Sequence, residues 1–386
     1  MTGADRIAAA LSRAGADRTP VVIPYEGIFI RDHWDQLTSC PWWHQFSPEI
    51  ELQLAWRSDC INAIGQDWIA IPLCGRREER TRWRVVPLED GGAVLENTAT
   101  GERRPLQRPE VGGQDHYGRT LAAGYSSSHP PMPDTAEAID EQIPAPDPAA
   151  LAGIESDGRC DLARALMAGP ARGLFPICHA ISPLWSCLAT WNFEDTMARC
   201  MTDPDLVRRA CLRRLEHSKA SVRAAAALGA AGIWIEECMT DMLGPDQFSD
   251  LNVPAVSALV EEIRRCGMKS ILYFCGNPAG KWDSLLRIGA DALAFEENKK
   301  GFEIDIADAA ARTAGRCALL GNLDAINLLP TASDQELERE VRRQVEAGRI
   351  NGCRFVLSLG SPVTPGTPVW RVRAYCDMAR KHALRP

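Results

Sequence analysis

The chain has 386 residues with a formal net charge of −8, and 45% of its residues are hydrophobic, as in an ordinary globular protein. The negative charge argues against nucleic acid or an anionic membrane as the main partner. No apolar run reaches the roughly 20 residues that a bilayer-spanning helix needs. Residues 1–6 lack the basic flank and apolar core of a signal peptide. We therefore expect a cytoplasmic protein, with most of its 14 scattered cysteines reduced and buried.

Short apolar segments alternate with helical patterns along the chain. The predicted strands are residues 21–23, 68–72, 174–178, 233–237, 270–274, 292–295, 318–321 and 355–359. The predicted helices are residues 5–14, 49–65, 205–228, 253–266, 278–288, 304–314 and 334–347. Eight strands without clean polar alternation, separated by helices, predict one (β/α)₈ barrel over residues 1–386. A doubly wound sheet is the alternative, but the first strand is not followed by its glycine-rich phosphate fingerprint.

Two segments interrupt this pattern before residue 150. Residues 79–107 contain two strand-like runs around Asp90-Gly91-Gly92, which predicts a β-hairpin insertion. Residues 108–148 are rich in Pro, Gly, Ser and Asp, which predicts a long loop with little regular structure that could cover a site as a lid.

Polar side chains gather where the predicted strands end, which is where the active site of such a barrel lies. His179, Glu237 with Cys238, and Cys275 follow the third, fourth and fifth strands. One carboxylate and two thiols are ligands that suit Zn²⁺, so Glu237, Cys238 and Cys275 are candidate metal ligands. The alternative is that Glu237 binds a ligand and Cys275 is a buried thiol. Further candidates at later strand ends are Glu297, Asn322, Asp324 and Ser361.

Six segments resemble the uroporphyrinogen decarboxylase superfamily: residues 17–21, 230–235, 289–292, 321–324, 355–361 and 365–368. The resemblance implies a (β/α)₈ barrel with its pocket at the carboxyl ends of the strands. Residues 272–277 are more similar to the corrinoid-dependent methyltransferases within this superfamily. That branch implies a cobalamin carried on a partner protein, and the superfamily resemblance makes a homodimer plausible.

The same resemblance implies a zinc ion held by a His-x-Cys pair and a second cysteine. Cys275 matches the first cysteine of that set, but Tyr273 stands where the histidine would be and Ser361 where the second cysteine would be. Losing two ligands weakens zinc binding unless other donors replace them, and Glu237 and Cys238 are the candidate replacements.

Three functions remain open. The first is a methyltransferase that moves a methyl group between a small O-, N- or S-methyl compound and a corrinoid or thiol-type carrier, with zinc around Cys275. The second is a metal-free decarboxylase of a carboxylated aromatic or pyrrole, with Arg31 holding the carboxylate and Glu296, Glu297 or Asp324 managing the proton. The third is a non-catalytic small-molecule or corrinoid binder. Two groups of residues are the predicted site: Tyr273, His179 and Glu297 for catalysis, and Arg31, Trp34, Asn322, Asp324 and Ser361 for substrate binding.

Overall fold

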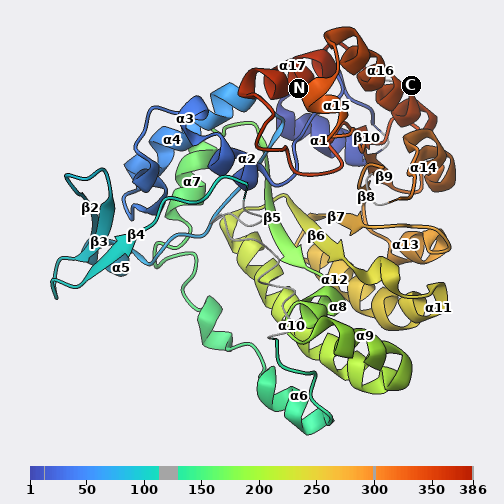
Figure 1. Ribbon diagram of the computed structural model, residues 1–386, viewed down its shortest axis with the longest axis horizontal. Helices are drawn as coiled ribbons and strands as arrows, with labels where there is room; N and C mark the ends of the chain where they lie inside the picture. The colour runs from blue at the N-terminus through green and yellow to red at the C-terminus, as the bar shows by residue number, and fades with distance from the viewer. Residues whose placement is uncertain (13, 113–128, 299–300, 385–386) are drawn as a thin grey trace.

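The computed structural model describes residues 1–12, 14–112, 129–298 and 301–384. Seven parallel strands form one curled sheet in the order β1-β5-β6-β7-β8-β9-β10 (Figure 1). The strands are β1 (Trp68–Ala70), β5 (Phe175–Ile181), β6 (Gly232–Cys238), β7 (Lys269–Cys275), β8 (Ala292–Phe295), β9 (Ala318–Leu320) and β10 (Phe355–Val356). All seven overlap predicted strands, so the barrel prediction is confirmed.

The segment Pro20–Ile23 completes the ring between β10 and β1. Val22 N donates to Leu357 O at 2.9 Å, and Leu357 N donates to Pro20 O at 2.9 Å. On the other side, Asp67 N donates to Val21 O at 2.8 Å. The predicted first strand is therefore present as a short bridging segment that makes backbone hydrogen bonds with both edges of the sheet.

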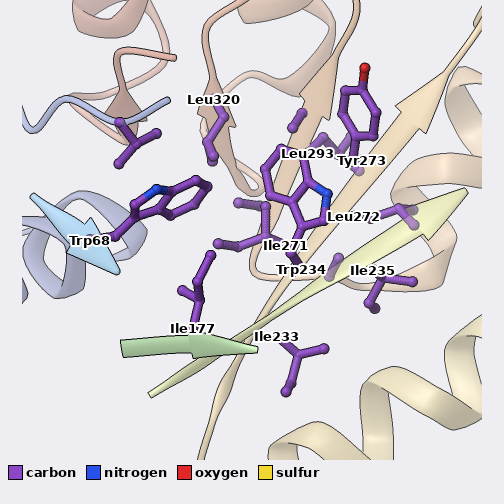
Figure 2. Close-up of a cluster of buried hydrophobic side chains, with 14 of the residues drawn as sticks. Trp68, Ile177, Ile233, Trp234, Ile235, Ile271, Leu272, Tyr273, Leu293 and Leu320 are labelled. Carbon is purple, nitrogen blue, oxygen red and sulfur yellow. The ribbon is translucent and has the colours of Figure 1, made fainter. Parts of the chain in front are cut away.

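The interior of the barrel is filled by large side chains (Figure 2). Trp68 and Trp234 meet edge to face with ring centroids 5.6 Å apart, and Trp234 stacks on Tyr273 at 4.9 Å. Ile233 and Ile235 leave the other face of β6 and pack under the helices. Successive residues of a strand point to opposite faces, so this pattern assigns a side to every residue of β6 and β7.

Most of the helices lie around the outside of the sheet (Figure 1). The helices of the described residues are α1 (Gly3–Leu11), α2 (Glu26–Asp32), α3 (Trp34–Leu37), α4 (Ile50–Ile64), α5 (Arg77–Arg82), α6 (Ala136–Gln142), α7 (Asp161–Ala168), α8 (Pro183–Leu188), α9 (Phe193–Thr202), α10 (Pro204–Leu228), α11 (Pro245–Gln247), α12 (Val253–Arg265), α13 (Trp282–Ile288), α14 (Ile306–Thr313), α15 (Leu328–Thr331), α16 (Asp334–Ile350) and α17 (Val369–Arg380). Short helical turns are η1 (Trp42–Phe46), η3 (Pro148–Leu151), η4 (Thr240–Met242) and the π-helical η5 (Phe248–Asn252). Every predicted helix is present.

The predicted hairpin is confirmed but carries a third strand. β2 (Trp83–Pro87), β3 (Ala93–Asn97) and β4 (Arg103–Leu106) form an antiparallel sheet separate from the barrel. The carboxylate of Glu96 in the central strand accepts hydrogen bonds from Arg84 and Arg103 on its two neighbours. β4 escapes the sequence pattern because it contains two arginines and a proline, residues that an edge strand tolerates.

The predicted loop 108–148 is more ordered at its C-terminal end than expected. Residues 136–142 form α6, which is capped by the Thr135 hydroxyl and packs on α10. The ion pair between Asp140 and Arg209 joins these two helices. Residues 113–128 lie outside the described residues, so the lid remains a prediction.

Within the described ranges, helices with enough length and apolar character to cross a bilayer are absent.

Candidate active site at the barrel mouth

The carboxyl ends of β6 and β7 bring two cysteines together inside the barrel. Cys238 and Cys275 are register partners, so their side chains leave the sheet on the same face. The neighbouring Cys275 thiol, together with burial, raises the pKa of the Cys238 thiol well above its usual value. The structure thus brings together two of the three residues that were predicted as metal ligands.

Tyr25 lies beside this pair although the sequence analysis did not select it. Its backbone is left-handed, with φ of 55°, and this turn carries the phenol into the barrel. Its ring centroid lies 5.7 Å from that of His179 and 5.9 Å from that of Tyr273. Trp234 Nε1 donates to the Tyr25 hydroxyl at 3.3 Å. Burial and the nearby Glu236 carboxylate raise the pKa of Tyr25 well above its usual value, so it is a neutral hydrogen-bonding group.

His179 and Glu236 form a polar pair at the same mouth. His179 on β5 and Glu236 on β6 lie on neighbouring strands, and Nδ1 of the imidazole is 3.0 Å from Oε1 of the carboxylate. Both side chains are half-buried, at 29% and 22% exposure, so they remain accessible to a ligand. A carboxylate on Nδ1 orients the ring and sets its tautomer, which leaves Nε2 to exchange a proton.

Glu237 belongs to a different environment. As the residue between Glu236 and Cys238 it leaves the outer face of β6, where it is fully buried. Thr240 Oγ1 donates to its Oε1 at 2.7 Å and Asn252 Nδ2 donates to its Oε2 at 2.9 Å. Burial raises its pKa to about 7. The structure therefore does not bring Glu237 to the two cysteines, because adjacent strand residues point to opposite faces.

Tyr273 connects β7 to the segment after β10. Its hydroxyl donates to Gly360 O at 2.9 Å, and burial raises its pKa well above its usual value. On the other side of Gly360 lies Glu297, which is buried; a Cβ on Gly360 would lie 2.3 Å from its Oε2. Ser361 is also buried beside this contact. Tyr273 is thus a buried structural residue that joins β7 to the segment after β10, rather than an exposed reacting group.

Asn322 and Asp324 serve the backbone. The Asn322 amide donates to Glu296 O at 3.1 Å and to Ile304 O at 2.7 Å, and so joins the ends of β8 and β9. The Asp324 carboxylate accepts from the backbone of Ile326 and Asn327. Both side chains were predicted to bind substrate. In the structure they form hydrogen bonds with backbone groups at a strand end and in a turn.

The residues at the mouth do not fit the three-ligand zinc site that the resemblance implies. Cys238 and Cys275 offer two sulfur donors, but Glu237 lies on the opposite face and the Tyr273 hydroxyl is held by Gly360. In the part of the chain that the structure describes, groups of three or more His, Cys, Asp or Glu side chains arranged to hold a metal ion are absent.

A cavity of about 370 Å³ lies between α2, α4 and β1, next to the mouth. It has the size of a small-molecule pocket. Trp34, Trp56 and Trp68 give it aromatic walls, and the two predicted substrate-binding residues Arg31 and Trp34 both line it. Arg31 is buried and forms an ion pair with Asp32 at 2.7 Å.

Two ionisable residues in this cavity escaped the sequence analysis. Glu26 accepts from Ala70 N at 2.8 Å and from the Gln66 amide, and burial raises its pKa to about 7. Arg57 lies 3.9 Å from the centroid of the Trp56 ring, and burial lowers its pKa to about 10. Glu26 directly follows Tyr25 in the chain, so the cavity lies beside the mouth.

Sequence signals existed for some of the missed residues. Trp234, Glu236 and Cys238 follow each other at spacing two, which puts all three on one face of a strand and selects Glu236 rather than Glu237. Tyr25 and Glu26 lie just past the first strand, the position expected for site residues, but the chain turns there in an unpredictable left-handed conformation. Arg57 lies on α4, whereas only residues that follow predicted strands were considered as site candidates.

Comparison with known proteins places this geometry in a family. The model of the uroporphyrinogen decarboxylase (URO-D) family matches residues 177–382, from β5 through α17. The uroporphyrinogen decarboxylase of Solibacter usitatus is 27% identical over 195 residues, which cover 50% of this chain and 53% of the relative. That of Thermodesulfovibrio yellowstonii is 28% identical over 153 residues, covering 40% and 42%. The chain thus spans about half the length of these curated relatives.

A solved structure shares the whole fold. A methyltransferase from Methanosarcina mazei superposes with a TM-score of 0.67 over 99% of each chain, at 18% sequence identity. This likeness concerns the barrel and its connections. Because the family model covers more than half of the chain, the protein belongs to the uroporphyrinogen decarboxylase family.

Proposed function

We propose that this protein is a methyltransferase that moves a methyl group between a small O-, N- or S-methyl compound and a corrinoid or thiol-type carrier. The observation that carries this proposal is the chemistry of the mouth. The mouth combines the His179–Glu236 pair, the Tyr25 phenol and the thiols of Cys238 and Cys275. The stacked rings of Trp234 and Tyr273 lie beside these groups. Proton transfer and small-molecule positioning are the tasks that such groups perform.

The charges favour this proposal over decarboxylation of a tetrapyrrole with many carboxylates. The mouth presents the carboxylate of Glu236, which is 22% exposed and pairs with His179. The arginines of the cavity are already engaged, Arg31 with Asp32 and Arg57 with Gln53. Carboxylates near a polyanionic substrate would repel it, whereas a neutral or cationic methyl compound meets no such penalty.

In this proposal each group has one task. The cavity beside α2 binds the methyl compound against Trp34 and Trp56. His179, oriented by Glu236, accepts the proton of an attacking thiol or returns a proton to the leaving group. A corrinoid on a partner protein would supply the carrier that receives or donates the methyl group at the mouth.

The test is a methyl-transfer assay with cob(I)alamin or a small thiol as acceptor and a panel of O-, N- and S-methyl donors. We expect turnover with one class of donor and a loss of about 10²-fold in kcat/KM for His179→Ala, the usual size of general acid–base catalysis. His217→Ala is the matched control, because His217 lies on α10, where its ring contacts Pro144 O. Absence of transfer with every donor would overturn the proposal.

One observation favours a second function. Arg31 and Arg57 line the same cavity as Glu26, a carboxyl group with a pKa of about 7. A cation beside a proton donor is what a metal-free decarboxylase of a carboxylated aromatic needs. Release of CO₂ from such a compound, lost in Arg31→Ala, would select this function instead.

A further inference from the structure

The pair formed by Cys238 and Cys275 has the geometry of a cross-strand disulfide. The two residues are register partners on adjacent parallel strands, whose backbones lie about 4.8 Å apart. This separation falls within the Cα spacing of about 4.4–6.8 Å that disulfides adopt. Because the two residues are register partners, both side chains leave the sheet on the same face, at neighbouring strand ends.

The surroundings allow this pair to react. Both residues are half-buried at the mouth, whereas most of the remaining cysteines, such as Cys187 and Cys211, are buried. Each of the two strands also ends at its cysteine. Met239 follows with a φ of 64° and Gly276 with a φ of 139°, so neither sulfur is fixed inside a continuing ladder.

We infer that Cys238 and Cys275 form a redox modification site, at which a low-molecular-weight disulfide such as oxidised glutathione generates a cross-strand disulfide. One protein thiolate attacks the glutathione disulfide, forms a mixed disulfide and expels one glutathione. The second protein thiolate then attacks the cysteine sulfur of that mixed disulfide and expels the other glutathione. Two protein thiols are oxidised, one glutathione disulfide is reduced to two thiols, and the two thiol protons end on the glutathiones.

The exchange brings both sulfur atoms into one bond at the mouth, whichever thiol is attacked first. The product joins the ends of β6 and β7 beside Tyr25. This chemistry does not depend on the proposed methyl transfer.

The experiment equilibrates the full-length native protein with mixtures of oxidised and reduced glutathione. Acid quenching, alkylation of the remaining thiols and peptide mass spectrometry then locate the bonds. We expect one linked pair of peptides, containing Cys238 and Cys275, with the loss of two hydrogens per chain and full reversal by dithiothreitol. Both single variants, Cys238→Ser and Cys275→Ser, should lose the linked peptide completely, and Cys238→Ser should retain glutathione on Cys275.

A matched control comes from another pair of thiols. Cys187 on α8 and Cys211 on α10 lie on two helices that pack together, but both cysteines are buried. Cys187→Ser should leave the Cys238–Cys275 linkage unchanged. The inference is overturned if glutathione stays on Cys275 in the wild-type protein without linkage, or if the Cys187–Cys211 pair links as readily.

Discussion

At the scale of single residues, two buried carboxyl groups share a raised pKa but differ in surroundings. Glu26 faces a cavity, whereas Glu237 is enclosed between β6 and the helical layer. Burial raises the pKa of each to about 7. Ionisation of Glu26, which faces the cavity, changes what the cavity binds. Ionisation of Glu237, which is buried behind the sheet, changes the free energy of unfolding.

For Glu237 the effect on stability depends on pH. The folded pKa of about 7 exceeds the unfolded value of 4.5, so the folded state holds the proton more tightly. The stabilisation is complete below pH 4.5 and is lost as the pH rises through 7. We expect Glu237→Gln to gain about 2 kcal/mol over wild type in free energy of unfolding between about pH 5 and pH 8.

Urea denaturation at pH 5, 6, 7 and 8 measures this difference. The exposed Glu51→Gln on α4 is the control and should show no such trend. Parallel pH dependences of wild type and Glu237→Gln would contradict the prediction.

For Glu26 the effect concerns the cavity. If it donates a proton to a bound substrate, activity should fall above pH 7, by about tenfold per pH unit, as the carboxyl group ionises. Glu26→Gln should lower kcat/KM at pH 6 and remove this limb of the profile. Measurement of kcat/KM from pH 5 to 9 tests it, and a limb that persists in Glu26→Gln assigns the ionisation to another group.

The residues of the site were predictable in part. His179, Cys238 and Cys275 were predictable because a parallel barrel places the carboxyl ends of all its strands at one mouth. Glu237 was predicted in place of Glu236 because the alternation of side chains between the two faces of a strand was not considered. Ligand roles were also predicted for Asn322 and Asp324, whose side chains satisfy backbone groups that only the folded chain reveals.

At the scale of elements, close approach between β8 and the segment after β10 shapes one side of the mouth. Gly360 lies against Glu297, and its carbonyl receives the Tyr273 hydroxyl. The Asn322 amide ties the ends of β8 and β9 in the same region. These contacts join the three strand ends to one another.

Substitution of Gly360 tests this packing. The Cβ of Gly360→Ala would lie 2.3 Å from Glu297 Oε2 and 2.4 Å from Glu297 N, so the backbone has to shift. We expect a loss of about 2 kcal/mol in the free energy of unfolding, typical of overpacking. Gly366→Ala is the control, since a Cβ added there would meet no described atom within 4 Å. Equal stability of the two variants by urea denaturation would contradict the prediction.

The elements themselves were largely predictable. Apolar runs such as Ser270–Phe274 are buried on both faces and carry a strong signal. Among the elements that were not predicted, β4 and α6 are short and polar and gain their structure from a neighbour, through Glu96 for β4 and α10 for α6. Such elements depend on contacts that local sequence does not encode.

At the scale of the whole molecule, closure of the barrel depends on one buried carboxylate. Asp67 accepts from both Nη atoms of Arg18, at 2.9 and 2.7 Å, and from Val21 N at 3.0 Å. The same residue bonds β5 through its carbonyl, which accepts from Phe175 N. Asp67 thus joins the first strand segment to β1 and β5, which gives a physical reason for the Asp17–Val21 motif.

Asp67→Asn should weaken this closure. It removes the charge that compensates Arg18 at a site where Asp67 is 2% exposed, and we expect a loss of about 2 kcal/mol. Glu78→Gln breaks the exposed pair with Arg82 and should cost less than about 0.5 kcal/mol. Thermal unfolding monitored by circular dichroism compares the two, and an unchanged Tm in Asp67→Asn would remove Asp67 from this role.

The left-handed turn at Tyr25 has a consequence for how this site can change. Tyr25 and Glu26 are consecutive, yet one side chain serves the mouth and the other the cavity. A non-glycine residue holds that conformation only at a cost of about 1 kcal/mol, so the surrounding contacts must enforce it. Relaxation of this one residue would withdraw the phenol and reorient the carboxyl group in the same movement. A change in this segment therefore alters the cavity and the mouth together. Variants selected for binding a new ligand in the cavity should carry a second substitution at the mouth.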